Sequence, residues 1–515
     1  MGASRSFPGL DQDRLSLLSG STLGLISRRR CVYCYPATRT CPRGISGETK
    51  QGVIDQMANQ KDIQKLALHG GLKAVTRFEG KGKPKIGVEE FMSIADRFGF
   101  SQPALKKIRA AIAKEEMGGG PMLANYYSGL KETRVQAVER AAREIFGVKY
   151  AIGVSSGTGA LNSAFVAAGV GPGTEVICPA IGFFATAAAV VHSKGVPVFC
   201  DVDESLGMDP AKIEKVITKR TVAIAPTHVM GSVANMGPIM KVARKHGLRV
   251  IEDCAQSPGA KYKGRWVGTI GDIGIFSISA YKIVGCGEGG LIVTNSKRLW
   301  ERAQGLAECG GLWRPVRFAP PRYDGELFCG TNYRMSELEA AVDVVQLRKM
   351  PATVARFHKV KMRILKQLKT CREIVPQKVN DPAGEVGYTL RFFPETIELG
   401  EKIIAALQAE GIGCSMRGRN APPDWHVYSY MFAIVNKQGA TPDNCPFECP
   451  LYLQKGGKAR YSRGDCPVAD DLFDRVMTIG LNQWFTVRDC AAIAKAINKV
   501  LSAYCTESPD AAPWM

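Results

Sequence analysis

Between residues 149 and 256 the chain alternates short apolar runs with amphipathic segments, and this alternation constrains the fold more than any other feature. The apolar runs include KYAIGV, EVICPA, PVFCDVD, TVAIAPTH and LRVIEDCA, and segments such as ALNSAFVAAG and IMKVARKHG separate them. Strands that alternate with helices of this length form a parallel sheet with helices on both faces. The sequence therefore predicts an α/β fold with a mostly parallel, doubly wound sheet and active groups at the carboxyl ends of its strands.

The rest of the chain adds segments before and after this sheet. The N-terminal residues are rich in Ser, Arg and Gly without periodicity, and a transit peptide is the alternative to a plain leader. Two short helices are expected between Glu89 and Lys114, and RMSELEAAVDVVQLRKM predicts a long amphipathic helix. In chain order we predict a flexible leader (1–60), a helical arm (61–118), a large domain (119–349), a smaller α/β domain (350–505) and a loose tail (506–515).

The composition favours a cytoplasmic protein that handles anionic small molecules. The 16 cysteines are spread along the chain, as expected of reduced thiols. The net charge is +20, but Lys and Arg are scattered, so nucleic-acid binding is only a minor alternative to a basic surface. No apolar run reaches the ~18 residues that a membrane span needs. We expect neither a nucleic-acid partner nor a membrane.

Two groups of cysteines are candidate metal ligands. Cys31, Cys34 and Cys41 include one CxxC, but no second CxxC or histidine pair follows nearby. Cys445 and Cys449 lie in a proline-rich loop with a spacing that matches no common zinc site. We therefore predict no metal.

A single lysine, Lys282, lies in the run IGIFSISAYKIVGCGEGG among apolar and small residues. A lysine in a dry setting loses part of its preference for the charged form and can act as an amine nucleophile, although most lysines simply reach for water. Gly285, Gly287 and Gly290 spell GxGxxG, but they precede the strand-like LIVT and do not open a helix. We interpret Lys282 as a Schiff-base lysine and reject a dinucleotide fingerprint.

Small and acidic residues follow the predicted strands. The SSGTG turn places Gly157 and Thr158 at the start of a helix, where backbone N–H groups favour a phosphate, although such a turn is also glycine-rich for steric reasons alone. Asp253 ends LRVIED and is a candidate partner for a protonated ring nitrogen, or else a helix cap. Glu252 would point to the opposite face of a regular strand. Gln256 lies within reach of the same pocket as Asp253.

Taken together, these segments resemble the DegT/DnrJ/StrS family of sugar aminotransferases. These are pyridoxal-phosphate enzymes with the aspartate aminotransferase fold, known as fold type I. The resemblance is strong from about residue 127 to 349 and looser to 504. It depends on VSSGTGAL, PGTEVICPAIGFFATAAAV, PVFCDVD, PTHVMG, VIEDCAQSPGAKYKG, GDIGIFSISAYK, GEGG and GTNYRMSELEAA.

The resemblance implies one role in cofactor binding for each of eight residues, and a homodimer with its active site at the subunit interface. Lys282 would bind pyridoxal 5'-phosphate as a Schiff base and shuttle a proton. Asp253 would bind the ring nitrogen, Gln256 the phenolic oxygen or ring edge, and Phe183 would stack on the ring face. The phosphate would be bound by Gly157, Thr158 and Ser277. Asn332 would reach into the phosphate site of the neighbouring subunit.

The implied reaction moves an amino group from glutamate or glutamine to a nucleotide-linked keto-sugar or to a keto-cyclitol. It follows a ping-pong mechanism. A sugar dehydratase of the same family, which has histidine in place of the lysine, and a regulator without turnover are the alternatives. Four departures leave the acceptor open. They are Gly182 where the family usually has Thr, Ile278 where it often has Phe, a longer, more aromatic loop over Met416–Tyr430, and a longer N-terminal arm.

Overall fold

The structure is a computed structural model that describes residues 60–77, 85–113, 115, 121, 123 and 131–515. The chain separates into two compact units, Met1–Lys83 and Pro84–Met515. The described part of the first unit holds helix α2 (Gln60–Ile63) and the 3-10 turn η1 (Ala67–His69). Most of the predicted leader lies outside the described residues, and so do Cys31, Cys34 and Cys41.

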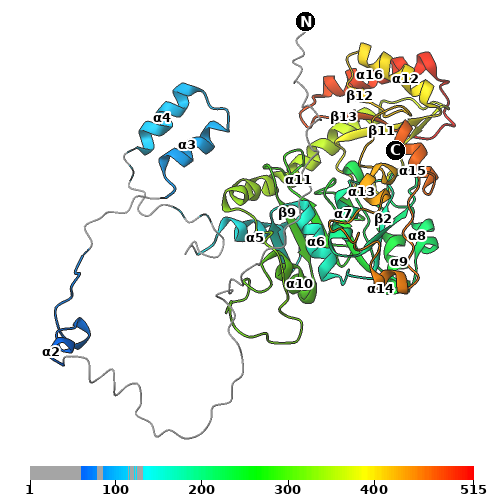
Figure 1. The fold of residues 1–515 in the computed structure, drawn as a ribbon. Coiled ribbons are helices and arrows are strands. Elements are labelled where there is room, and N and C mark those ends of the chain that lie inside the picture. Colours follow the sequence, from blue (N-terminus) through cyan, green and yellow to red (C-terminus); the bar gives the residue numbers. More distant parts are fainter. Residues whose placement is uncertain (1–59, 78–84, 114, 116–120, 122, 124–130) are drawn as a thin grey trace, which may run out of the picture. The chain divides into compact units, whose positions relative to one another are not determined.

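A seven-stranded sheet forms the centre of the large domain (Figure 1). Its order is β1-β9-β8-β5-β4-β2-β3, and only β9 runs antiparallel to its neighbours. This arrangement confirms the predicted fold class. The strands are β1 (Tyr150–Val154), β2 (Glu175–Pro179), β3 (Val196–Cys200), β4 (Thr221–Ile224), β5 (Arg249–Asp253), β8 (Ile273–Ser277) and β9 (Gly290–Thr294).

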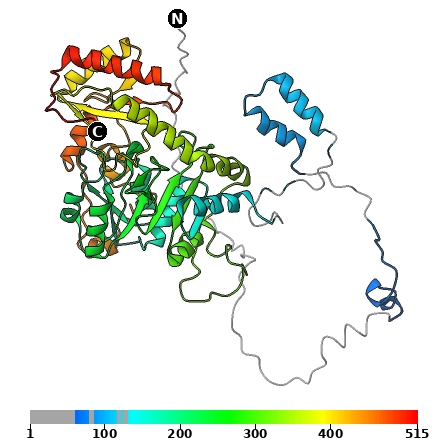
Figure 2. The ribbon, with the colours of Figure 1, turned by 180° about the vertical axis from the view of Figure 1, so that it is seen from behind.

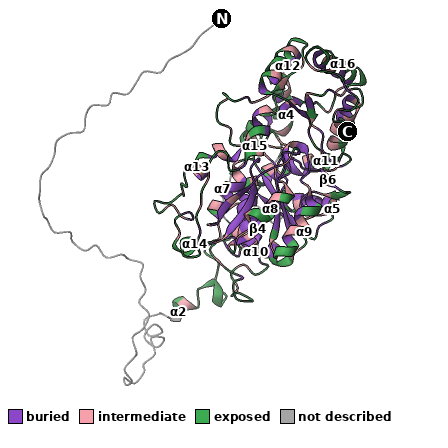
Figure 3. Ribbon diagram, turned by 90° about the vertical axis from the view of Figure 1, so that its right-hand side faces the viewer, coloured by how far each residue is buried: buried purple, intermediate pink, exposed green. Residues whose placement is uncertain are grey.

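Helices cover both faces of this sheet, and the buried residues form a separate core on each face (Figures 2 and 3). One core contains Phe165, Val190 and Leu299, from α6 (Gly157–Ala167), α7 (Ala185–His192) and α10 (Lys297–Ala307). The other core is built with α5 (Arg134–Phe146), α8 (Pro210–Val216), α9 (Met236–His246) and α11 (Glu337–Leu365).

Local sequence explains where these helices begin and end, and α5 is an example. The Thr133 hydroxyl accepts a hydrogen bond from Gln136 N at 3.2 Å, and the Gln136 side chain accepts one from Thr133 N at 2.9 Å. This reciprocal pair satisfies two N–H groups at the helix start. The helix ends at Gly147, whose φ of 66° is the left-handed conformation that glycine adopts without strain.

A smaller antiparallel sheet follows, with the order β10-β11-β13-β12. Its strands are β10 (Ile374–Pro376), β11 (Thr389–Pro394), β12 (Cys414–Ser415) and β13 (Met477–Gly480), and α12 (Ile397–Ala409) and α16 (Val487–Tyr504) share its core. Helix α11 is longer than predicted and continues through Pro351. The predicted boundary between residues 349 and 350 falls inside α11, and the domain limits stay predictions.

The segment 506–515, predicted to be a loose tail, is packed against the smaller sheet. The Trp514 side chain is only 8% exposed, its indole N–H donates to Lys369 O at 2.9 Å, and its ring meets Phe392 edge-on at 5.5 Å. The prediction of a loose tail is therefore wrong. Ser508 adds two hydrogen bonds, because its N–H donates to Thr370 O at 3.0 Å and its carbonyl oxygen accepts from the Thr370 hydroxyl at 2.6 Å. Burial of the Trp514 ring and these bonds together hold the segment against the sheet.

The remaining elements include the predicted pair of short helices, α3 (Val88–Asp96) and α4 (Gln102–Ile112), which are confirmed. Within the described residues, no helix combines the length and the apolar character needed to cross a membrane. The other elements are η2 (Val229–Gly231), β6 (Lys261–Tyr262), β7 (Arg265–Trp266), η3 (Tyr428–Tyr430), α13 (Phe432–Val435), α14 (Pro450–Gln454) and α15 (Pro467–Arg475).

Candidate active site

A cavity of about 390 Å³ lies where β1, β5 and β8 reach their carboxyl ends. Ligands of open α/β sheets bind at this edge. Seven of the eight predicted site residues line the cavity, namely Gly157, Thr158, Phe183, Asp253, Gln256, Ser277 and Lys282. The eighth, Asn332, does not line it, and its side-chain oxygen accepts a hydrogen bond from Arg334 N at 3.2 Å.

Lys282 faces this cavity from the segment that follows β8. Burial lowers the pKa of its amine below the ordinary value of 10.5, and the negative charge of Asp253 opposes part of that shift. A lysine with a lowered pKa holds more unprotonated amine at neutral pH, and the unprotonated amine is the nucleophile. The chemistry predicted for Lys282 thus has a physical basis in its surroundings.

Asp253 ends β5 with its side chain only 3% exposed. One carboxylate oxygen accepts from Ala255 N at 3.0 Å, and the other accepts from the Thr186 hydroxyl at 2.6 Å. No Lys or Arg among the described residues forms an ion pair with this carboxylate. A buried negative charge without a cationic partner is suited to a protonated nitrogen of a ligand. Thr186 was not predicted from the sequence, because it lies on α7, far from Asp253 along the chain.

The start of α6 and Ser277 also line the cavity and lie close together. The first N–H groups of a helix have no acceptor within the helix and attract anions. Ser156 caps this helix, with its hydroxyl 3.0 Å from Gly159 N. A Cβ atom at Gly157 would lie 2.7 Å from Ser277 Cβ, so only glycine lets the helix start approach Ser277 this closely. The pair offers a phosphate both backbone N–H groups and a hydroxyl.

Gln256 is hydrogen-bonded to the turn η2. Its amide oxygen accepts from Met230 N at 2.9 Å, and Met230 has a φ of 50°, which is strained for a residue with a side chain. Its backbone oxygen accepts from the Tyr388 hydroxyl at 2.9 Å. Because the amide oxygen is engaged, a contact between Gln256 and a ligand falls to its NH₂ group.

The aromatic loop over Met416–Tyr430 supplies a residue that sequence analysis missed. Val427 pairs with Ile181 in a β-bridge, which places His426 in the cavity with its ring 5.2 Å from that of Phe183. His426 Nδ1 lies 2.8 Å from an oxygen of Asp424. The unusual length and aromatic content of the loop were the only signals in the sequence, and neither of them identified His426.

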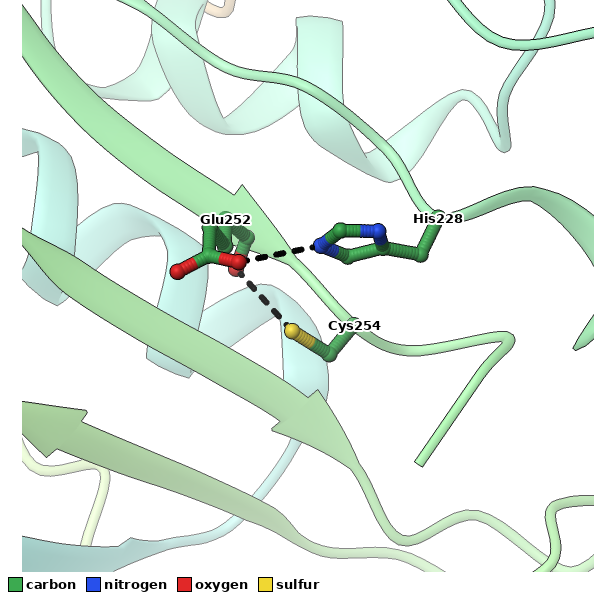
Figure 4. A group of neighbouring side chains, drawn as sticks. All are labelled: His228, Glu252 and Cys254. Carbon is green, nitrogen blue, oxygen red and sulfur yellow. Dashed lines mark hydrogen bonds and ion pairs between the residues drawn. The ribbon is translucent and has the colours of Figure 1, made fainter. Parts of the chain in front are cut away.

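His228, Glu252 and Cys254 form a cluster on the opposite side of β5, with potential ligand atoms within 4.8 Å of one another (Figure 4). His228 Nδ1 accepts from Ala234 N at 3.1 Å, so the proton of the ring is on Nε2. Glu252 accepts four hydrogen bonds, from His228 Nε2 and from the backbone N–H groups of Gly268, Ile270 and Gly271. These bonds explain the cluster as a structural network.

The chain matches a known protein family over most of the large domain. The model of the DegT/DnrJ/EryC1/StrS aminotransferase family matches residues 126–424, more than half of the chain. The chain belongs to this family. His426 lies just beyond the matched residues.

Three curated relatives illustrate the family. GDP-perosamine synthase of Caulobacter vibrioides is 40% identical over 228 residues, which cover 43% of this chain and 58% of the relative. UDP-N-acetyl-3-dehydro-alpha-D-glucosamine 3-aminotransferase of Acidithiobacillus ferrooxidans is 34% identical over 71% of this chain and 88% of the relative. L-glutamine:2-deoxy-scyllo-inosose aminotransferase of Streptoalloteichus tenebrarius is 41% identical over 40% of this chain and 49% of the relative.

Solved structures show the same fold. An aminotransferase from Psychrobacter cryohalolentis matches 79% of this chain and 98% of its own, with a TM-score of 0.59 and 27% identity. NtdA from Bacillus subtilis, with its cofactor PMP bound, matches with a TM-score of 0.57 over 83% of this chain and 87% of its own, at 21% identity. Family and neighbours together confirm the predicted family, fold type I and pyridoxal phosphate as the cofactor.

Proposed function

We propose that the protein is an aminotransferase that takes an amino group from glutamate or glutamine. It delivers this group to the keto group of a nucleotide-linked sugar or of a cyclitol, by a ping-pong mechanism. The convergence of Lys282, Asp253 and the start of α6 on one cavity carries this proposal. One relative is named for GDP-perosamine and another for L-glutamine and 2-deoxy-scyllo-inosose, which supports both acceptor classes and a glutamine donor.

The residues that line the cavity offer a chemical partner for each part of the cofactor. When bound, pyridoxal phosphate supplies an electron sink that stabilises the carbanion formed as the donor's α-carbon loses its proton. Asp253 is the anion for the ring nitrogen, and the Thr186 hydroxyl orients it. Gly157, Thr158 and Ser277 would bind the phosphate. Phe183 would stack on the ring face, and the NH₂ group of Gln256 would contact the ring edge.

Lys282 is the residue that we assign to proton transfer. Its lowered pKa keeps a larger fraction of the amine unprotonated, so it accepts the α-proton of the donor and delivers it again within the same cavity. Asp253 limits this shift, because its negative charge favours the protonated amine. The two residues thus set the basicity of the site between them.

The active site is proposed to be completed by a second copy of the chain. Tyr281, next to Lys282, is 100% exposed and Phe183 is 45% exposed, so the cavity is open on one side. Asn332 lies outside the cavity of its own chain, and we assign it to the phosphate site of the neighbouring subunit. A mixture of Lys282→Ala and Asn332→Ala proteins then restores part of the activity that each lacks, because each hybrid dimer has one intact site. No recovery after mixing would contradict an interface site.

We place the enzyme in the cytoplasm. Every described cysteine is a free thiol, as expected in a reducing compartment. Separation of intact cells into compartments, followed by immunodetection, tests this assignment, and detection outside the cytoplasm would overturn it.

The activity is tested by supplying the purified protein with pyridoxal phosphate and following the cofactor absorbance as amino donors are added. Bleaching by glutamate or glutamine, and its loss in Lys282→Ala, are the expected results. Lys149→Ala is the control, because Lys149 is exposed and far from the cavity along β1. A protein that binds the cofactor but reacts with no donor would instead be a regulator, and one that binds no cofactor would overturn the whole proposal.

A further inference from the structure

The turn η2 lies between the candidate active site and the smaller sheet. Met230, in its centre, has a φ of 50°, a conformation that residues with a side chain rarely adopt. Its N–H donates to the amide oxygen of Gln256 at 2.9 Å, and Gln256 lines the cavity of Lys282. A backbone conformation of this kind persists only where surrounding contacts hold it. The contacts that hold Met230 therefore also decide how the Gln256 amide is oriented.

Strand β11 of the smaller sheet supplies two of these contacts. Arg391 Nη1 donates to Met230 O at 3.0 Å, and the Thr389 hydroxyl donates to the same oxygen at 3.3 Å. Side chains alternate along a strand, and the neighbouring Phe392 belongs to the core of the smaller sheet. Thr389 and Arg391 thus face the large domain. Met230 is held at its N–H by Gln256 and at its carbonyl oxygen by β11.

Arg391 carries a charge at a buried position within β11. Its side chain is 5% exposed, and burial lowers the pKa of its guanidinium to about 10. Glu385 attracts it, but that carboxylate is bonded to Lys361 at 2.7 Å, and Nε of Arg391 has no acceptor among the described residues. An apolar side chain would fill such a position at lower cost. The position points to a role for its hydrogen bond to Met230.

The segment that leads into β11 reinforces this contact. The Tyr388 hydroxyl donates to Gln256 O at 2.9 Å, and Val386 N donates to Gly231 O at 2.9 Å. A Cβ atom at Gly231 would lie 2.8 Å from the Tyr388 ring, so the turn and this ring fit closely. The smaller sheet is therefore bonded to both η2 and Gln256.

We propose that Arg391 is a positioning residue of the cofactor site. By holding the carbonyl oxygen of Met230 it fixes the N–H of the same residue, which engages the amide oxygen of Gln256. The NH₂ group of Gln256 then remains available to the phenolic oxygen or ring edge of the cofactor. Arg391 does not line the cavity and acts only through Met230 and Gln256. The proposal rests on the aminotransferase function proposed above.

The orientation of the Gln256 amide affects the cofactor through its charge. A hydrogen bond from the NH₂ group stabilises negative charge on the phenolic oxygen, and so favours the form of the bound cofactor that has lost a proton. Without the bond between Arg391 and Met230 the amide can turn, and this stabilisation is lost. The pH midpoint at which the absorbance of the bound cofactor changes should then rise. This midpoint is measured without turnover.

Three variants test the proposal by pH titration of the cofactor absorbance. Arg391→Met removes the donor at similar length, and Arg391→Lys retains a donor. Arg475→Met is the matched control, because Arg475 Nη1 donates to Pro394 O at 2.8 Å at the end of the same strand and does not line the cavity.

We expect Arg391→Met to move the midpoint to higher pH and to weaken cofactor binding about tenfold. Arg391→Lys should recover part of both changes, and Arg475→Met should match the wild type. An unchanged midpoint in folded Arg391→Met, or an equal rise in Arg475→Met, would overturn the proposal.

A double variant tests whether Arg391 acts through Gln256. Gln256→Met removes the NH₂ group and should raise the midpoint by itself. Adding Arg391→Met to this variant should cause no further rise, because the group that Arg391 positions is already absent. Additive shifts would show that Arg391 acts by another route and would contradict the proposal.

Hydrogen exchange in the apoprotein provides a readout that needs no cofactor. The amide hydrogen of Met230 exchanges when its bond to Gln256 opens. Peptides that cover residues 229–232 should therefore exchange about tenfold faster in Arg391→Met, and at the wild-type rate in Arg475→Met. Equal exchange in all proteins would overturn the proposal.

Two outcomes are separated in advance. If Arg391→Met does not fold, Thr389→Val removes the second donor to the same carbonyl oxygen, and unchanged exchange in that variant would overturn the proposal. If the wild-type protein binds no pyridoxal phosphate, the proposed function fails, while hydrogen exchange still tests the contact. If it binds the cofactor and reacts with donors, but Arg391→Met has the same midpoint and exchange, only the positioning role fails.

Discussion

Two neighbouring carboxylates at the end of β5 serve opposite purposes. Glu252 and Asp253 are 0% and 3% exposed, so burial alone does not separate them. Glu252 accepts three backbone N–H groups and the Nε2 proton of His228, all fixed donors. Asp253 accepts one backbone N–H group and one hydroxyl, which is free to reverse its role.

This difference shows how one strand separates structure from chemistry. The side of β5 that carries Glu252 is closed by protein donors, and its carboxylate holds the turn over residues 268–271 against the sheet. The side that carries Asp253 has few fixed donors and faces the cavity. A carboxylate that the protein leaves partly unsatisfied is available to a ligand.

The largest expected effect is on folding and comes from Glu252→Gln. Either oxygen of Glu252 accepts at least two donors, so an NH₂ group in its place faces N–H groups that have no acceptor. We expect the free energy of unfolding to fall by roughly 3–5 kcal/mol. Urea denaturation of the apoprotein measures this change, and a loss below about 1 kcal/mol would show that the network is not structural.

Asp253→Asn is expected to have the opposite effect, with little loss of stability and a large loss of activity. The Asn amide still accepts from Ala255 N, and the Thr186 hydroxyl can rotate to accept from its NH₂ group, so the unfolding free energy should change by no more than about 1 kcal/mol. Loss of the negative charge should slow donor-dependent bleaching by about 10²- to 10³-fold. Stopped-flow absorbance and the same urea titration provide both values. Destabilisation as large as in Glu252→Gln would remove the contrast between the two residues.

Thr186→Val sharpens the comparison on the functional side. Without the hydroxyl, one oxygen of Asp253 loses its only protein donor, and the carboxylate is oriented less well. We expect about tenfold slower bleaching and weaker cofactor binding, as for the loss of one hydrogen bond to a charged group. Thr186→Ser retains the hydroxyl and should restore both quantities. Equal loss in Val and Ser would show that the Thr186 methyl group, and not its hydrogen bond, matters.

The smallest expected effect is a shift in pH dependence. Uptake of pyridoxal phosphate by the apoprotein needs the unprotonated amine of Lys282, so its rate rises with pH through the pKa of that residue. Asp253 raises this pKa, so Asp253→Asn should lower it further and move the profile to lower pH. Glu252→Gln should leave the profile in place, and a shift in both variants would show that the charge of Asp253 does not act on Lys282 specifically.

The sequence predicted much of the site because its residues lie next to regular elements. The SSGTG turn, LRVIED and the run around Lys282 each follow a strand, and parallel strands bring their carboxyl ends together. Glu252 and Asp253 were separated correctly by the alternation of side chains along a strand. Thr186, His426 and Arg391 were not predicted, because each depends on a contact between segments that are distant in the chain.

The sequence by itself determined the order of strands and helices, and it placed Lys282, Asp253 and the SSGTG turn directly after strands. These are set by periodicity and turn chemistry, which act over a few residues. Only the tertiary structure decided that Trp514 packs against the smaller sheet, that His426 joins the cavity beside Phe183, and that the Thr186 hydroxyl donates to Asp253. Such contacts depend on how whole elements pack. A local sequence pattern does not specify which side chains from distant segments will meet.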